Sequence, residues 1–453
     1  MKKARLSLFI LTAGLVSAGY AQQTSVPLPQ TPSGRRVEAY LKAFNAGESA
    51  MREFMTEQTA KDSLQKVPVE VRLNRYRQMR DRLGALDLRR VVESRDDFVS
   101  VMVHGGKGPL VNLEFQFEPA EPFGLIGIRI TDVGEEDIPA NPKKDRAEFI
   151  AAAREYAKKL AGADEFSGVI LVAQNGAPFL EEADGLADRE KKIPNRVDTK
   201  FNIGSINKSF TGLAVQQLIA QKRISPDDPI KKFLPDYPNP DAAEKVTVRH
   251  LLDMTSGVGD FFGERYQATP KEKIRSLQDY LPLFADQPLE FEPGTKNRYS
   301  NGGYIVLGLI IEKASGVDYY TYIRDHLYKP AGMGDTDSFD RGAAIPNRAV
   351  GYTRDGSSRK PNDDSLPWKG SSAGGGYSTA RDLLKYILAW KDGKLGGAEQ
   401  KTRSELMIAG GAPGLNAALY WDPKSTYTIV VLANYDPPAA EQVVRQIRSW
   451  LPR

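Results

Sequence analysis

A serine and a lysine one helical turn apart form the strongest chemical pattern in the chain. Ser205 follows Gly204, and Lys208 lies three residues further on, where a long apolar helical stretch begins. Residues three apart share one helix face, so their side chains are predicted to lie together. A lysine in a dry pocket loses proton affinity and can then activate a hydroxyl. The pattern predicts Ser205 as a nucleophile and Lys208 as its activating partner, with the Ser205 N–H free at the helix start to stabilise an oxyanion.

Context separates this pair from two other copies of the same spacing. Ser63/Lys66 and Ser357/Lys360 also match S-x-x-K. Ser357 lies in a polar loop, and Ser63 lies in the smaller N-terminal part of the chain. Only Ser205 combines a preceding glycine, a helix start and a long apolar helix behind it.

A tyrosine and an asparagine two residues apart are the second candidate element. Tyr299 and Asn301 come just before the apolar stretch GGYIVLGLII. A phenol beside a lysine ammonium is expected to have a lowered pKa and to relay protons. An asparagine there can hold a substrate carbonyl or the lysine. Y-x-N also occurs at Tyr237/Asn239, inside a proline-rich loop, so the loop-to-helix context of Tyr299 is what favours it.

Composition and missing motifs exclude other chemistries. The chain has no cysteine and three histidines, which excludes thiol catalysis and multi-histidine metal sites. There is no G-x-S-x-G, H-E-x-x-H or P-loop. His250 and His326 lie in helical patterns and are predicted to be structural, and His104 lies in the smaller part. We expect neither a metal nor a cofactor.

Two folded units are predicted to carry these residues. Residues 35–133 show helical patterns and then four stretches of period two, which predicts a small α+β domain. Residues 145–453 have strands near both ends and a mainly helical middle. This predicts an α/β (α+β) fold with one antiparallel sheet flanked by helices and a helical subdomain. Residues 22–34 and 134–144 are rich in Pro and polar residues and are predicted linkers.

The N-terminus predicts export. Lys2, Lys3 and Arg5 precede an apolar run over residues 6–16, and Gly19-Tyr20-Ala21 completes a signal-peptide pattern over residues 1–21. We expect a secreted or periplasmic protein without a stable membrane span after cleavage. The net charge of +4 falls close to zero without the leader, which is untypical of a nucleic-acid binder.

The motifs, in their order, resemble the serine β-lactamase and penicillin-binding protein superfamily in its class C-like branch. The resemblance runs from about Glu165 to Ala440, through FNIGSINKSFTGLAVQQLIAQKRISPDDPIKKFLP, VTVRHLLDMTSGV, FEPGTKNRYSNGGYIVLGLIIEKASG, SSAGGGYSTARDLLKY and GGAPGLNAALYWDP. It implies that Ser205 is acylated with Lys208 as its partner, that Tyr299 is a general acid/base, and that Asn301 binds the substrate and the lysine. Whether Lys208 or Tyr299 takes the first proton stays open.

The N-terminal unit has a resemblance of its own. The phrase EAYLKAFNAGESAMREFM resembles the opening helices of cone-shaped, nuclear transport factor 2-like domains. Such cones can hold a ligand. No paired carboxylate or histidine cluster in residues 35–133 predicts a site there.

The third motif of the superfamily departs from its pattern. The family has Lys or His, a small residue and then Gly on an inner strand beside the nucleophile, whereas this chain has Ile408-Ala409-Gly410. Ile408 offers neither charge nor hydrogen bond. The Gly411 N–H is expected to survive as an oxyanion donor, because any residue type supplies it.

Two classes of function remain. The favoured one is an exported serine hydrolase that acts on ester, amide or peptide bonds of a small-molecule or peptide acyl substrate, with true β-lactamase activity less favoured. The alternative is a catalytically impaired binding protein for peptidoglycan or peptide ligands. Ser205, Lys208 and Tyr299 favour the first, and Ile408 favours the second.

Overall fold

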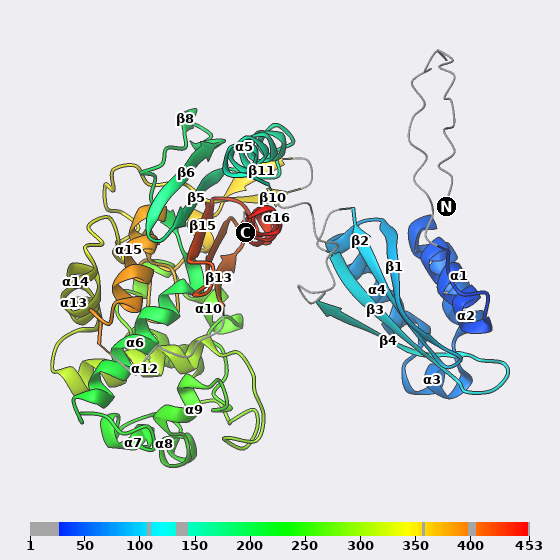
Figure 1. Ribbon diagram of the computed structural model, residues 1–453. Helices are drawn as coiled ribbons and strands as arrows, with labels where there is room; N and C mark the ends of the chain where they lie inside the picture. The colour runs from blue at the N-terminus through cyan, green and yellow to red at the C-terminus, as the bar shows by residue number, and fades with distance from the viewer. Residues whose placement is uncertain (1–26, 107–109, 133–143, 356–357, 397–404, 452–453) are drawn as a thin grey trace, which may run out of the picture. The chain divides into compact units, whose positions relative to one another are not determined.

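The chain forms two compact units, residues 1–139 and residues 140–453. The structure is a computed structural model that describes residues 27–106, 110–132, 144–355, 358–396 and 405–451 (Figure 1). The predicted signal peptide and most of the predicted linker at 134–144 lie outside these residues. No helix among them is both long enough and apolar enough to cross a bilayer.

The first unit is a set of helices followed by an antiparallel sheet, as its sequence periods predict. The sheet has the order β1-β2-β3-β4. Its apolar core includes a group of aromatic side chains, with Tyr40 in edge contact with Phe54 and Phe115. The elements are α1 (Pro32–Ala46), α2 (Glu48–Gln58), α3 (Lys61–Lys66), α4 (Val69–Leu83), β1 (Leu86–Arg95), β2 (Phe98–Gly105), β3 (Leu110–Phe117) and β4 (Leu125–Asp132).

The first helix begins inside the segment predicted to be a linker. α1 starts at Pro32, so the predicted boundary at residue 34 is corrected by three residues. The Thr31 side chain accepts a hydrogen bond from the Gly34 N–H, and proline at the first helical position has a backbone angle that already suits a helix. The C-terminal end of this proline-rich segment is therefore the start of a helix.

Ser63 has a structural role in this unit. Its hydroxyl donates to the Ile126 carbonyl oxygen at 2.5 Å and accepts from the Arg72 guanidinium at 2.6 Å. The hydroxyl therefore ties α3 to β4. These contacts agree with the preference for Ser205 over Ser63 as the nucleophile; Ser357 lies outside the described residues.

The second unit is built on a five-stranded antiparallel sheet of order β13-β14-β15-β5-β6. Its strands are β5 (Gly168–Gln174), β6 (Ala177–Asp184), β13 (Leu406–Ala412), β14 (Leu415–Trp421) and β15 (Tyr427–Ala433). Alternate residues of β5 face opposite sides of the sheet. Ile170 and Val172 pack with α5 (Arg146–Gly162) and α16 (Ala439–Trp450), whereas Val169 and Leu171 join the large helical core. The predicted sheet with helices on both faces is confirmed.

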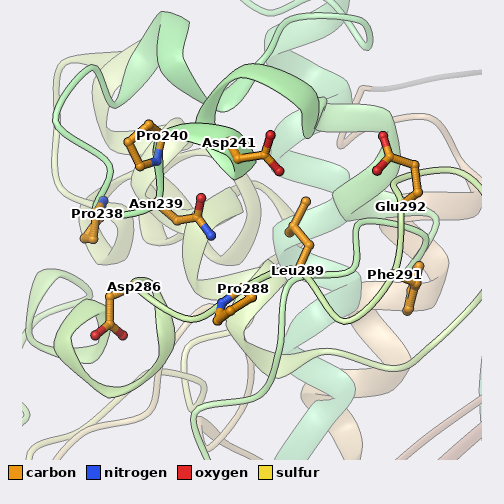
Figure 2. A pocket seen from close by; sticks show the side chains of 9 residues that line it. All are labelled: Pro238, Asn239, Pro240, Asp241, Asp286, Pro288, Leu289, Phe291 and Glu292. Carbon is orange, nitrogen blue, oxygen red and sulfur yellow. The ribbon is translucent and has the colours of Figure 1, made fainter.

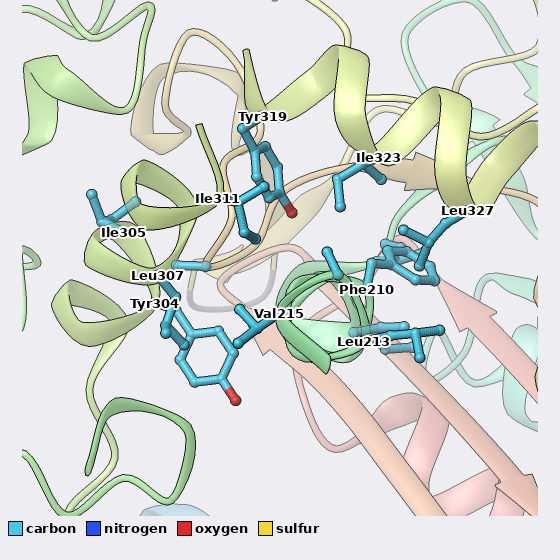
Figure 3. Packing of buried hydrophobic residues seen from close by; sticks show 14 of the residues in the cluster. Phe210, Leu213, Val215, Tyr304, Ile305, Leu307, Ile311, Tyr319, Ile323 and Leu327 are labelled. Atoms are coloured by element: carbon cyan, nitrogen blue, oxygen red, sulfur yellow. The ribbon is translucent and has the colours of Figure 1, made fainter. Parts of the chain in front are cut away.

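Two buried helices form the centre of the large core. α6 (Asn207–Ala220) and α12 (Asn301–Ser315) pack against each other, and Figure 3 shows Phe210 and Val215 of α6 among the apolar side chains of α12 and its neighbours. Both helices are apolar on nearly all sides, as expected for helices enclosed by protein. Their burial fixes the N-termini of both helices, where Lys208 and Asn301 lie.

Shorter strands and helices complete the second unit, and the helices among them belong to the expected helical subdomain. They are β7 (Leu186–Asp188), β8 (Ile193–Pro194), β9 (Phe201–Asn202), α7 (Ile230–Phe233), α8 (Pro240–Lys245), α9 (Val248–Leu252), α10 (Glu264–Ala268), α11 (Leu281–Phe284), α13 (Tyr319–Ile323), α14 (Lys329–Ala331), β10 (Tyr352–Asp355), β11 (Ser358–Pro361), β12 (Tyr377–Ser378) and α15 (Ala380–Lys391).

Candidate active site

Ser205 lies on a tight turn that is pressed against the edge strand of the sheet. It is the middle residue of a 3₁₀ turn, Gly204–Ile206, which runs directly into α6. Gly204 has φ +50°, and a Cβ there would lie 3.0 Å from the Gly411 nitrogen of β13. A Cβ on Gly410 would lie 2.7 Å from the Ser205 nitrogen and 2.1 Å from the Ile203 oxygen. The two glycines therefore let β13 pass directly beside the nucleophile.

Lys208 is buried and directs its ammonium group at three acceptors. Its Nζ donates to Ser205 Oγ at 3.2 Å, to Asn301 Oδ1 at 2.7 Å and to the Ala373 carbonyl oxygen. Only 8% of the residue is exposed. Burial lowers the pKa of Lys208 to about 7, against the opposing effect of the Asp260 carboxylate. Both the neutral and the charged lysine are therefore accessible near neutral pH, as the sequence predicted for a lysine in a dry pocket.

The Tyr299 phenol also contacts the Ser205 hydroxyl. Its phenol oxygen lies 2.6 Å from Ser205 Oγ, and either hydroxyl can donate. The Lys208 nitrogen lies 4.7 Å from the centroid of the Tyr299 ring. Burial raises the pKa of Tyr299, so the predicted lowering is wrong. Loss of solvent around a phenolate outweighs the hydrogen bond from Ser205, and the Asp260 charge acts in the same direction as burial.

Asp260 orients Asn301 and was not found from the sequence. The Asn301 side-chain NH₂ donates to Asp260 Oδ2 at 2.7 Å, and the Asn301 backbone N–H points at the same oxygen at 3.3 Å. A carboxylate accepts only, so the amide must turn its Oδ1 toward Lys208. The contact spans 41 residues of sequence, and no local spacing marks it.

The start of α12 is locked onto the loop that carries Asp260. The Ser300 hydroxyl donates to the Gly259 carbonyl oxygen at 3.0 Å and accepts the Gly303 N–H at 2.8 Å as the helix cap. A Cβ on Gly302 would lie 2.3 Å from the Gly259 oxygen. This close fit holds Tyr299 and Asn301 on either side of Ser300, both directed toward α6.

A pocket of about 530 Å³ opens over these groups. Its walls are mostly apolar, and of the described residues that line it only Glu441 has a carboxylate or another formally charged side chain. The lining residues are Asn202, Gly204, Ser205, Phe261, Phe262, Tyr299, Asn301, Leu366, Pro367, Ala373, Gly374, Gly375, Ala409, Gly411, Ala412, Pro413, Leu415 and Glu441. The predicted site residues Ser205, Tyr299, Asn301 and Gly411 thus share one cavity, and Lys208 lies beneath it.

A second hollow of about 470 Å³ has no comparable chemistry. Figure 2 shows its lining, which consists of three prolines, three acidic side chains, Asn239, Leu289 and Phe291, with no serine or lysine. The Asn239 side chain accepts from the Ala242 N–H and caps α8. Asn239 of the second Y-x-N match is therefore a helix cap.

The histidines of the second unit have structural positions. His250 belongs to the capping box of α9, where its Nδ1 faces the Thr247 N–H at 3.3 Å. The His326 ring packs on Tyr322 with 4.3 Å between ring centroids. Within the described parts of the chain, no group of three or more His, Cys, Asp or Glu side chains could hold a metal ion.

β13 presents different residues to the pocket than the sequence indicated. Ile408 packs against the large core, whereas Ala409, Gly411 and Ala412 line the cavity. Ile408 is therefore not among the residues that line the described pocket. β13 is also the edge strand of the sheet and not an inner strand.

Two cations that lie close to Tyr299 in the sequence, Lys296 and Arg298, do not line the pocket. Arg298 pairs with Glu290 at 2.9 Å, Lys296 is exposed, and Arg403 lies outside the described residues. Within the described lining, the pocket therefore offers a substrate carboxylate no arginine or lysine at its surface.

Comparison with known proteins agrees with this geometry. A family model described as Beta-lactamase matches residues 153–409, more than half of the chain. The chain belongs to the beta-lactamase family. The match includes the turn, both central helices and the start of β13, so Ser205, Lys208, Tyr299 and Asn301 all lie within it. It does not reach the first unit, for which the nuclear transport factor 2-like assignment stays a prediction.

Relatives of this beta-lactamase-family chain include penicillin-binding proteins. Penicillin-binding protein 4* of Bacillus subtilis (strain 168) is 33% identical over 196 residues, which are 42% of this chain and 43% of that protein. The chain spans 43–63% of the length of its first curated relatives.

Solved structures share the fold. A penicillin-binding protein from Bacillus halodurans matches with a TM-score of 0.59 and 31% identity, over 68% of this chain and 99% of that one. EstCE1, described as a hydrolase with promiscuous acyltransferase activity, has a TM-score of 0.56 at 20% identity, over 67% of this chain and 98% of that one, and shows a common fold alone.

Proposed function

We propose that the second unit is a serine hydrolase that forms an acyl-enzyme on Ser205 and cleaves esters or amides. One observation carries the proposal. The Ser205 hydroxyl lies at once within hydrogen-bond distance of Lys208 Nζ and of the Tyr299 phenol, at the floor of a pocket. A nucleophile held between a base and an acid is the arrangement that acyl transfer needs.

In the first step, Ser205 Oγ attacks the substrate carbonyl carbon as its proton leaves. Neutral Lys208 is the group able to take that proton, because its pKa lies near 7 whereas that of the Tyr299 phenol is raised. The phenol keeps its proton and is placed to pass it to the leaving group. Asn301, held by Asp260, orients the lysine throughout.

The negative oxygen of the tetrahedral intermediate needs donors that are already in place. The backbone N–H groups of Ser205 and Gly411 are the candidates, since β13 runs beside the turn and Gly411 lines the pocket. One such donor contributes about 2.7–4 kcal/mol to transition-state stabilisation. Water then attacks the acyl group, the proton moves in the reverse direction, and Ser205 is released with the acid product.

Neutral esters are the favoured substrates over β-lactams. β-Lactams carry a carboxylate, and the described lining of the pocket has an acidic side chain but no arginine or lysine. A lost charge-assisted contact costs about 1.5–3 kcal/mol. Hydrolysis of short p-nitrophenyl esters should therefore exceed that of penicillins, and comparable efficiency on both would contradict this.

The direct test is the mass of the protein after exposure to a fluorophosphonate probe. Wild type should gain one phosphonyl group, and Ser205→Ala should gain none. Labelling that persists in Ser205→Ala would refute Ser205 as the nucleophile. Steady hydrolysis of p-nitrophenyl esters by the wild type, absent in Ser205→Ala, would complete the case for turnover.

A binding protein for peptidoglycan or peptide ligands is the second candidate. It is favoured by β13, whose pocket-facing residues Ala409, Gly411 and Ala412 bring no charged or hydrogen-bonding side chain. Stoichiometric labelling of Ser205 with no turnover of any ester would favour this reading over the hydrolase.

We also propose export. The charged segment, apolar run and Gly19-Tyr20-Ala21 of residues 1–21 carry this proposal. N-terminal sequencing of protein recovered from outside the cytoplasm should find Gln22 first. Recovery of a chain that starts at Met1 would contradict cleavage.

A further inference from the structure

Glu441 is an acidic side chain on the wall of the Ser205 pocket, and the mechanism does not use it. It lies in the first turn of α16, and no other described residue of the pocket lining has a formally charged side chain. One of its carboxylate oxygens, Oε2, is fully enclosed and has no hydrogen-bond partner. A buried carboxylate keeps its charge only if another charge or hydrogen-bond donors compensate for the solvation that it has lost.

The protein supplies only part of that compensation. Burial raises the pKa of Glu441, whereas its own backbone N–H, the Asn416 side chain and, at longer range, Arg445 oppose this shift by favouring the charged carboxylate. The helix start contributes in the same direction. Among the ion pairs of the described residues none includes Glu441, although α16 carries two arginines, Arg445 and Arg448. Because Glu441 lines the pocket, a positive charge bound there would lie near its carboxyl group.

Glu441 is connected to the reacting end of the pocket through one residue. Asn416 donates to the Gly410 carbonyl oxygen at 3.1 Å and accepts the Ala440 N–H at 2.5 Å, so it joins β13 to the start of α16. Asn416 is paired with Gly411 across the two strands, and a Cβ on Gly411 would lie 2.6 Å from Pro437 Cγ. The acid is thus fixed beside the strand that carries the predicted oxyanion donor.

We propose that Glu441 is a specificity residue that selects acyl substrates bearing a positively charged ammonium group. The inference rests on the proposed hydrolase function of the same pocket. The ammonium supplies the missing charge, the apolar walls bury the rest of the substrate, and a substrate carboxylate is repelled. Glu441 does not touch the reacting bond, so its effect falls on the choice of substrate and not on the chemistry of Ser205.

Matched ester pairs that differ in one atom test the proposal. On the acyl side, p-nitrophenyl 4-(trimethylammonio)butanoate is compared with p-nitrophenyl 5,5-dimethylhexanoate. On the leaving-group side, butyrylcholine is compared with 3,3-dimethylbutyl butyrate. In each pair a quaternary nitrogen replaces a carbon, so shape is kept and only charge changes. The variant is Glu441→Gln, and Glu155→Gln on the exposed face of α5 is the control for loss of one negative charge.

In wild type, kcat/KM should favour the cationic member of at least one pair by about 10- to 100-fold. Glu441→Gln should reduce that preference to within about threefold, and Glu155→Gln should keep it. No preference in either pair, or a preference that survives in Glu441→Gln, overturns the proposal. Melting temperatures of the variants show whether each is folded.

A binding measurement separates this proposal from the hydrolase proposal. Calorimetry with choline and with 3,3-dimethylbutan-1-ol needs no turnover, and fluorophosphonate labelling reports Ser205 with a neutral probe. Choline that binds wild type more tightly than the alcohol, and loses this advantage in Glu441→Gln, supports the role of Glu441 even if no ester is hydrolysed. Equal binding of the two in wild type that is labelled at Ser205 refutes the role of Glu441 and leaves the hydrolase intact.

Discussion

At the scale of single residues, the site depends on how one hydroxyl is shared. Ser205 Oγ is 2.6 Å from the phenol of Tyr299 and 3.2 Å from Lys208 Nζ. The first contact is between neutral groups, whereas the second involves a lysine whose pKa of about 7 makes it the better proton acceptor. The two side chains therefore have different expected roles.

Removal of either partner should slow acylation. We expect Lys208→Ala and Tyr299→Phe each to lower the rate of fluorophosphonate labelling by roughly 10²–10⁴, the range of a lost general acid or base. Tyr304→Phe is the matched control, because its ring also lies near Lys208, 5.6 Å from Nζ to the centroid, but does not bond Ser205. A Tyr299→Phe variant that behaves like Tyr304→Phe would exclude the phenol from proton transfer.

The pH dependence of acylation should report Lys208. Below pH 7 the lysine is protonated and cannot accept a proton, so the labelling rate should rise with pH through about 7 and then level off. The Asp260 carboxylate raises the pKa of Lys208, so Asp260→Asn should move the midpoint to lower pH. A midpoint that stays in place or moves upward in Asp260→Asn would contradict this assignment.

At the scale of elements, the site is the meeting point of a turn, a helix start and an edge strand. Helical spacing alone places Lys208 beside Ser205, which is why this pair was predictable. The distant partner Asp260 was not, because its contact depends on how α12 packs on a loop. The packing of Ile408 in the large core was also not predictable, because it depends on how β13 pairs with β14 and packs on the helices.

The tight passage of β13 past the nucleophile can be tested by adding one methyl group. Gly410→Ala should destabilise the unit by about 1–3 kcal/mol and abolish labelling, because its Cβ would overlap the Ile203 oxygen and the Ser205 nitrogen. Gly212→Ala in α6, with nothing within 4 Å of the added Cβ, is the control and should keep activity. Thermal unfolding and probe labelling measure both effects, and a fully active Gly410→Ala would refute the close approach.

At the scale of the whole molecule, the sequence predicted two units of different architecture. The change from helical to period-two patterns marked the first, and strands at both ends of a helical middle marked the second. Composition misplaced the start of the first unit, because a proline- and serine-rich segment serves equally as a tether and as a helix N-terminus. The match to the beta-lactamase family covers the second unit only.

Independent folding of the two units is a further prediction. A fragment of residues 27–132 has its own apolar core and should unfold cooperatively by itself. A fragment of residues 144–453 should keep labelling at Ser205, since the described pocket residues all lie within it. Circular dichroism and probe labelling of the two fragments test this. An unfolded 27–132 fragment, or loss of labelling in 144–453, would show that each unit needs the other.

The edge position of β13 leaves backbone groups of this strand available to bind a substrate. β14 pairs with one side of this strand, and no described strand pairs with the other. An unpaired strand edge offers a row of amide donors and carbonyl acceptors, which extended peptides use by adding as one more strand. A peptide that enters this pocket would thus be recognised first by its main chain. Affinity should then grow with the length of the extended segment, and replacing backbone amides by esters along it should weaken binding even where every side chain is kept.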